Sequence, residues 1–184
     1  VITGINSGAN LGQDVLFSGT FGAALTAQLF GIPAIATSLV GGGTKNDDAQ
    51  QASHYQMAAN EIVKLITDTP ILEACKNLPY HVLNVNIPDV KSVAAIKGRK
   101  ITALSHSQIA RPVHHVVDPR GRDAYWLSLR KRQRELLTDD ASIESAEIQM
   151  MDDQAVAAGY ISVSPVRLHH TPTETLASLS ALVL

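Results

Sequence analysis

Residues suited to binding an anion gather near the start of the sequence, between Gly4 and Thr20. This segment reads Gly-Ile-Asn-Ser-Gly-Ala-Asn-Leu-Gly-Gln-Asp-Val-Leu-Phe-Ser-Gly-Thr. A short apolar strand precedes it, and a helix is predicted to begin at its end. The first N–H groups of such a helix lack partners within the helix and lie at the positive end of its dipole, which favours a phosphate group. The pattern therefore predicts a phosphate site at the start of this helix.

Five residues of the segment offer specific contacts. Gly19 lets a ligand approach the backbone, and Ser18 and Thr20 add hydroxyl donors. Asn6 and Asn10 carry neutral amide oxygens, which suit a hard cation or can orient a phosphate. The glycine spacing matches neither the phosphate loop that ends in Lys-Ser/Thr nor a dinucleotide fingerprint. The residues alone leave a second interpretation open, in which the glycines and asparagines build a turn and Ser18 only caps the helix.

A strand and a helix must hold this segment in place. Val1 to Thr3 is predicted as the end of a strand, and Gly4 to Gly12 as a loop without hydrophobic period. Ser18 is the predicted N-cap of the helix. The apolar face of the helix is predicted to contain Phe21, Ala24, Leu25 and Leu29. Ile32 to Val40 lacks alternation, as expected for a strand covered on both faces, and completes a βαβ unit.

The same α/β pattern extends to about residue 97. A long helix capped by Asn46 or Asp47 is predicted to close near Pro70, and His81 to Ile87 is a further strand. Apolar residues make up 45 % of the chain and aromatic residues 4 %. A core of aliphatic side chains suits a parallel sheet with helices on its faces, so we predict an α/β layer over residues 1–97.

After residue 97 the pattern changes to hairpins. Lys100 to Leu104 and Ala124 to Leu129 are predicted strands, and Asp118-Pro119-Arg120-Gly121 is a turn signal. Arg130 to Glu147 is charged and could form an exposed helix, and Tyr160 to Val166 is predicted as another strand. Thr173 to Leu184 is predicted as a short terminal helix. Residues 98–184 are therefore expected to form a hairpin arm and a terminal helix.

Length and charge narrow the class of protein. A chain of 184 residues is long enough for one domain with a proper core. The formal net charge of −2 gives no general attraction to nucleic acid. Cys75 cannot form an internal disulfide, and no apolar run approaches the ~20 residues of a membrane span. The start, Val1-Ile2-Thr3-Gly4, lacks the charged region and the cleavage site of a signal peptide. We therefore expect a cytoplasmic protein. A chain that opens directly on a strand without Met is expected to be the interior of a longer protein.

Several motifs together resemble the SurE family of stationary-phase survival proteins. They are Gly4-Ile5-Asn6, Gly8, Asn10-Leu11-Gly12, Asp14-Val15, Ser18-Gly19-Thr20, Gly31 to Ala36, Leu83 to Pro88, Asp118 to Gly121 with Tyr125-Trp126, Asp152 to Val156, and Gly159 to Pro165. The resemblance spans nearly the whole chain and corresponds to about the C-terminal two thirds of the family. It implies a Rossmann-like domain, of which residues 1–97 form the C-terminal part, and an oligomerising arm at 98–184 that builds dimers or tetramers.

The resemblance also implies an activity. Proteins of this family are 5'/3'-nucleotidases that hydrolyse nucleoside monophosphates with a divalent cation, Mg²⁺ or Mn²⁺. Carried over by position, Asn6 matches a metal ligand, and Asn10, Ser18, Gly19 and Thr20 match residues on the phosphate side of the site. The family's metal-binding Asp pair and a serine lie upstream of Val1, so no catalytic residue is expected within this chain.

The missing carboxylates open a second hypothesis. A neutral amide binds Mg²⁺ or Mn²⁺ too weakly without anionic partners. A chain that lacks the Asp pair would then be an inactive, oligomerising fragment that binds phosphate weakly.

Other chemically suggestive residues have structural explanations. The pairs His114-His115 and His169-His170 are adjacent in sequence, and adjacent side chains on a strand point to opposite faces and cannot chelate together. Asp47-Asp48 suits the start of a helix because of the dipole. The run from Arg130 to Glu135 is followed closely by acids, so a solvated face is the preferred interpretation.

Overall fold

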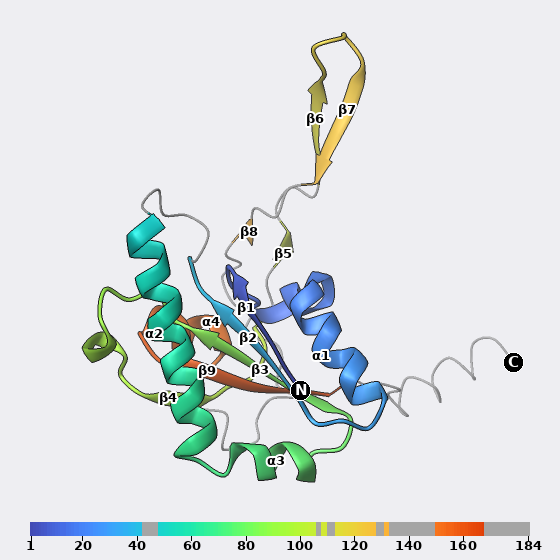
Figure 1. Cartoon of the computed structure of the whole chain (residues 1–184). Coiled ribbons are helices and arrows are strands. Elements are labelled where there is room, and N and C mark those ends of the chain that lie inside the picture. The colour runs from blue at the N-terminus through green and yellow to red at the C-terminus, as the bar shows by residue number, and fades with distance from the viewer. Residues whose placement is uncertain (42–47, 106–107, 110–112, 128–130, 133–149, 168–184) are drawn as a thin grey trace, which may run out of the picture.

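The computed structural model describes residues 1–41, 48–105, 108–109, 113–127, 131–132 and 150–167. Its centre is a five-stranded sheet (Figure 1). The strands, in spatial order, are β1 (Ile2–Ser7), β2 (Ala34–Leu39), β3 (His81–Ile87), β9 (Ile161–Arg167) and β4 (Arg99–Ile101). The first three are parallel, whereas β9 runs antiparallel to β3 and parallel to β4. The predicted α/β fold is confirmed, with a mixed sheet in place of a fully parallel one.

Helices cover both faces of the sheet. Helix α1 (Gly19–Leu29) lies on one face, and α2 (Asp48–Thr67) lies on the other with α3 (Ile71–Asn77) at its end (Figure 1). The core on the α1 side contains Val15, Phe21, Ala24, Ala34, Ala36 and Val82. The core on the α2 side contains Ile35, Leu39, Ala58, Ile62, Leu65, Cys75, Leu83, Val85, Ile87, Ile161 and Val163. All six residues of β2 are buried, which explains why its sequence shows no alternation.

Two elements near the candidate site differ from the sequence prediction. Strand β1 continues to Ser7, beyond the predicted end at Thr3, because its register with β2 shifts between Thr3 and Asn6 and pairing then resumes. Gly4 has φ of 108° inside this irregularity, and a Cβ there would collide with the carbonyl oxygen of Thr37. The loop that follows is also shorter than predicted, since a 3-10 helix, η1 (Gly12–Phe17), precedes α1.

The long helix predicted to close near Pro70 is α2, and a second helix follows it. Helix α2 ends at Thr67, and the short α3 follows after Pro70, which sequence reasoning missed. Cys75 in α3 is buried, and burial raises the pKa of its thiol above the ordinary value. A buried, neutral thiol of this kind packs as a small apolar side chain.

The sheet extends past residue 97. Strands β4 and β9 both follow this position, and both join the same sheet as β1, β2 and β3. The 3-10 helix η2 (Val93–Ala95) leads into β4, and α4 (Asp152–Ala157) leads into β9. The division predicted at residue 97 therefore does not mark the edge of the sheet.

A hairpin of β6 (Val113–Val117) and β7 (Asp123–Leu127) extends away from the sheet (Figure 1). At its base, β5 (Gln108–Ile109) pairs with β8 (Lys131–Arg132), so these two residues of the predicted exposed helix lie in a strand. The remainder of that predicted helix, Arg130 and residues 133–147, and the predicted terminal helix at 173–184 lie outside the described residues.

The predicted turn at Asp118 closes this hairpin. Asp118 accepts hydrogen bonds from the backbone N–H groups of Arg120 and Arg122, at 2.8 and 3.0 Å, and from Nε of Arg122 at 2.8 Å. The bonds from Arg122, and then the one from Arg120, hold the pKa of Asp118 below its ordinary value of 3.8. Ionised Asp118 thus stabilises the turn.

This lowered pKa predicts a pH dependence of the turn. A carboxyl whose pKa is depressed by folding contributes fully above its ordinary value, and the contribution is lost as the pH falls through the depressed one. We expect the amide chemical shifts of Arg120 and Arg122, followed by NMR against pH, to change with a midpoint below 3.8. Asp118→Asn should remove this transition; a midpoint at or above 3.8 would contradict the assignment.

Candidate functional site

Asn6 and Thr20, two of the predicted site residues, are in direct contact. Thr20 Oγ1 donates to Asn6 Oδ1 at 3.1 Å, and Asn6 Nδ2 donates to the carbonyl of Gly8 at 3.0 Å. Thr3 Oγ1 adds a hydrogen bond to the carbonyl of Thr20 at 2.8 Å. The end of β1 and the start of α1 are therefore tied side by side at the carboxyl edge of the parallel strands, where ligands bind in open α/β sheets.

The start of α1 has a side-chain cap and is exposed to solvent at Gly19. Ser18 Oγ accepts from the backbone N–H of Phe21 at 3.1 Å, which confirms Ser18 as the N-cap. Gly19 is exposed, and a Cβ placed on it would have no heavy atom within 4 Å. The open space beside Gly19 leaves the backbone at the positive end of the helix accessible to an anion.

Asn10 lies elsewhere, beneath the loop and 5 % exposed. Its Nδ2 donates to Ser38 Oγ at 2.8 Å, and its backbone N–H donates to Asn86 Oδ1 at 2.9 Å. Its carbonyl accepts from Nδ2 of Asn84 at 2.8 Å and of Asn86 at 3.0 Å. The structure therefore does not bring Asn10 to the exposed start of α1; its contacts match the alternative in which asparagine builds the turn.

Asn84, Asn86 and Asp152 are the residues that sequence reasoning missed. Each is fully buried and holds the loop between β1 and α1: the asparagines bind Asn10, and Asp152 Oδ2 accepts from the N–H of Gly12 at 2.7 Å. The polar residues inside the buried β3 pattern were a signal for the asparagines, because a buried amide needs partners. Asp152 follows Gly12 by 140 residues, and no local pattern relates the two.

A divalent cation requires more ligands than this part of the chain offers. No group of three His, Cys, Asp or Glu among the described residues could hold a metal ion. Asn6 supplies one neutral oxygen, which already accepts a hydrogen bond from Thr20. Because Mg²⁺ and Mn²⁺ need anionic oxygen ligands, the described residues do not by themselves fit the cation. The predicted pair His169-His170 lies outside the described residues.

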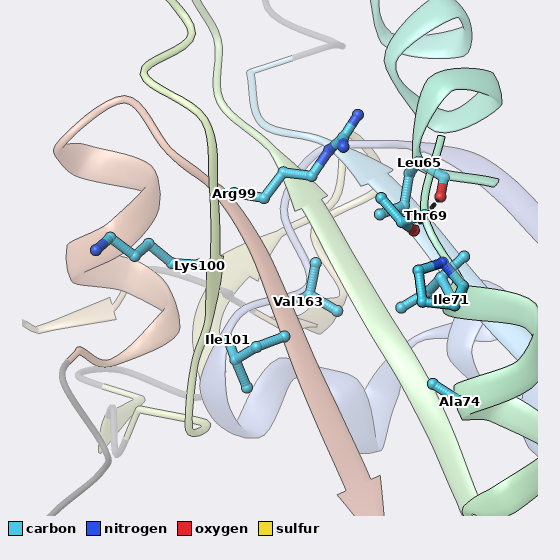
Figure 2. Close-up of a pocket in the computed structure, with 9 residues that line it drawn as sticks. Leu65, Thr69, Ile71, Ala74, Arg99, Lys100, Ile101 and Val163 are labelled. Atoms are coloured by element: carbon cyan, nitrogen blue, oxygen red, sulfur yellow. Dashed lines mark hydrogen bonds between the residues drawn. The ribbon is translucent and has the colours of Figure 1, made fainter. Parts of the chain in front are cut away.

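A separate hollow of about 300 Å³ lies between the ends of α2 and α3 and the strands β4 and β9 (Figure 2). Leu65, Ile71, Ala74, Ile101 and Val163 give it an apolar wall. None of the predicted site residues lines it. This hollow is therefore not the predicted phosphate site.

Across the part of the chain that the structure describes, no helix combines the length and apolar character needed to cross a membrane.

Comparison with known proteins agrees with the fold. The model of the family described as survival protein SurE matches residues 1–111. A 5'-nucleotidase SurE of Psychrobacter cryohalolentis is 76 % identical over 184 residues, which cover 100 % of this chain and 68 % of that protein. A 5'-nucleotidase SurE of Acinetobacter baylyi is 41 % identical over 184 residues, 100 % of this chain and 66 % of that protein.

A solved structure gives the same result. The crystal structure of the SurE protein from Aquifex aeolicus has a TM-score of 0.62 and 29 % sequence identity, and the match covers 99 % of this chain and 64 % of that one. The fold and the site define an α/β protein whose first helix, α1, starts at the carboxyl edge of the sheet beside an exposed glycine. The chain belongs to the SurE family. It spans about two thirds of the length of the relatives that it matches.

The contacts of Asn86 predict a large effect on stability. Asn86→Ala removes the acceptor for the Asn10 N–H and leaves that group buried without its partner, so we expect the free energy of unfolding to fall by about 2–4 kcal/mol. Urea denaturation measures this change. Asn60→Ala on the exposed side of α2 is the control and should change stability by less than about 0.5 kcal/mol. Equal effects of the two variants would contradict the role of Asn86.

Proposed function

We propose that the protein acts as a nucleotidase, a phosphomonoesterase that hydrolyses nucleoside 5'- and 3'-monophosphates to nucleoside and phosphate with a divalent cation, Mg²⁺ or Mn²⁺. Its family membership supports this proposal, since the relatives matched over the whole chain are named 5'-nucleotidases. The observation that carries it is the hydrogen bond between Thr20 and Asn6, which joins the amide at the end of β1 to the open start of α1.

The start of α1 would receive the phosphate group. The helix has 11 residues, so its dipole places a partial positive charge at Gly19. Gly19 gives the phosphate oxygens access to the backbone N–H groups, and Ser18 holds the first turn through its cap. The hydrogen bond from Thr20 holds Oδ1 of Asn6 beside the start of α1. Asn10 supports the phosphate site indirectly, because its hydrogen bonds to Ser38 and Asn86 fix the loop and do not reach the ligand.

The cation is the incomplete part of the site. When bound, it would supply Lewis-acid stabilisation of the charge that develops on the phosphate oxygens. Asn6 is the ligand that we propose from this chain, and the carboxylates that complete the set would come from residues outside this sequence.

A second candidate function rests on the neutral charge of Asn6, the one metal ligand that we propose from this chain. The chain could act as a phosphate-binding module without turnover, because one neutral amide does not hold Mg²⁺ or Mn²⁺ by itself. Such a module would bind phosphate at the start of α1 and cleave nothing.

Phosphate release from nucleoside monophosphates in the presence of Mn²⁺ separates these functions. In a protein that carries the completing carboxylates together with this chain, we expect Asn6→Ala to lower kcat/KM by about 100-fold, equivalent to roughly 2.7 kcal/mol, because the variant loses a ligand and the partner of Thr20. Asn77→Ala, at the exposed end of α3, should retain wild-type activity.

Two results would change the assignment. Metal-dependent turnover that survives Asn6→Ala would exclude Asn6 as a ligand. An inactive wild type whose Gly19 and Thr20 amide signals still shift in NMR when phosphate is added would favour the binding module.

We also propose that the protein forms a dimer or tetramer through the hairpin of β6 and β7, and that it works in the cytoplasm. On this hairpin, Tyr125 is 70 % and Trp126 is 72 % exposed. A two-stranded hairpin is marginally stable alone, and exposed aromatic side chains of this kind are typical of protein interfaces.

Light scattering coupled to size-exclusion chromatography tests this association. We expect the wild type to elute with a mass that is a multiple of 19.6 kDa, and Trp126→Lys to shift it toward 19.6 kDa because a charge replaces the apolar contact. Leu72→Lys changes an exposed apolar residue of α3, away from the hairpin, and should leave the mass unchanged. A monomeric wild type would contradict the proposal.

A further inference from the structure

The two chain segments that lead to and from the hairpin arm meet at one point. We call them the arm root, Ala103–Ser105 on the outgoing side and Met151–Asp152 on the returning side. Ala103 and Met151 form a β-bridge, and the backbone N–H of Asp152 donates to the carbonyl of Ala103 at 2.9 Å. The backbone N–H of Ser105 donates to Asp152 Oδ1 at 2.9 Å. The carboxylate of Asp152 thus joins both sides of the arm root.

The same carboxylate also holds the candidate site. Asp152 Oδ2 accepts from the backbone N–H of Gly12 at 2.7 Å, and Gly12 lies at the start of η1. Gly12 has φ of 55°, and a Cβ on it would collide with the carbonyl oxygen of Ser105. The backbone of the loop therefore packs directly against the arm root, with no space for a side chain between them.

Burial and three hydrogen bonds hold Asp152 in place at this contact. Asp152 is 0 % exposed, and its carboxylate accepts three backbone hydrogen bonds, from Gly12, Ser105 and Asp153. A buried carboxylate is strongly destabilised without such donors, and bonds to an ionised acceptor are among the stronger ones. A shift of the arm root would therefore carry the Gly12 N–H with it.

Gly12 is connected to the site on both sides along the chain. After it, η1 ends at Phe17 and Ser18 caps α1. Before it, the backbone of Gly8 binds the amide of Asn6 and the carbonyl of Leu39. The contacts at Gly8 and Asn10 come from the central strands, whereas the contact at Gly12 comes from the arm root.

We propose that Asp152 is a positioning residue of the phosphate site. By holding the backbone N–H of Gly12, it fixes the positions of η1 and the start of α1 relative to Asn6. The inference rests on the proposed phosphate site at Gly19 and Thr20. It assigns to the arm a function beyond association, because displacement of the arm root changes phosphate affinity through a single carboxylate.

An NMR titration with inorganic phosphate tests this role without requiring turnover. Phosphate affinity is read from the amide signals of Gly19 and Thr20 in the full chain. We expect Asp152→Asn to weaken phosphate binding by at least fivefold and to speed hydrogen exchange at the Gly12 amide. The introduced NH₂ group cannot accept a hydrogen bond, so at least one of the three backbone donors loses its acceptor.

A core truncation that lowers the melting temperature separates positioning from general stability. Ile62→Ala removes apolar contacts on the α2 side of the sheet, away from Gly12 and Asp152. It should leave the phosphate affinity within twofold of the wild type. An equal loss of affinity in Ile62→Ala and Asp152→Asn, or unchanged affinity in Asp152→Asn, would overturn the proposal.

Gly12→Ala provides a second variant if Asp152→Asn does not fold. It keeps the carboxylate but pushes the loop away from Ser105, so it should weaken phosphate binding in the same direction. Wild-type affinity in Gly12→Ala would overturn the proposal. If the proposed nucleotidase activity is wrong but the positioning role is right, the wild type binds inorganic phosphate at Gly19 and does not hydrolyse nucleotides.

Discussion

The structure depends on one constraint, that the buried backbone of the loop between β1 and α1 must find hydrogen-bond partners away from water. An unpaired buried N–H or carbonyl is destabilising by about 1–3 kcal/mol, so a loop under the surface is fixed by whatever side chains satisfy it. Here two asparagines of β3 bind the backbone of Asn10, and Asp152 binds Gly12. The two asparagines of the otherwise apolar strand β3 thus satisfy the loop backbone at Asn10.

This buried clamp explains how a glycine-rich segment can form a defined site. Glycine gives the loop the left-handed conformation at Gly12 and the close contact with Ser105, but glycine alone would leave the backbone free to move. The hydrogen bonds from Asn84, Asn86 and Asp152 restrict the loop backbone. Asn6 and Thr20 are then held together beside the exposed start of α1. Rigid support of this kind is what a binding site for a small anion requires.

The sequence predicted the local parts of this arrangement and not the long-range ones. The cap at Ser18, the buried strand β2 and the turn at Asp118 follow from neighbouring residues and agree with the structure. The role of Asn10 was harder to predict, because the sequence of a polar loop does not show whether an asparagine faces solvent or a neighbouring strand. The contact of Asp152 with Gly12, the antiparallel direction of β9 and the membership of β4 in the sheet depend on contacts that no local pattern contains.

The central claim is that the start of α1 beside Asn6 receives a phosphate group. A crystal structure of the protein with a bound nucleoside monophosphate tests it most directly. The account predicts phosphate oxygens within hydrogen-bonding distance of the backbone N–H groups of Gly19 and Thr20, with the amide of Asn6 facing them. A phosphate bound elsewhere, with Gly19 still open to solvent, would contradict it.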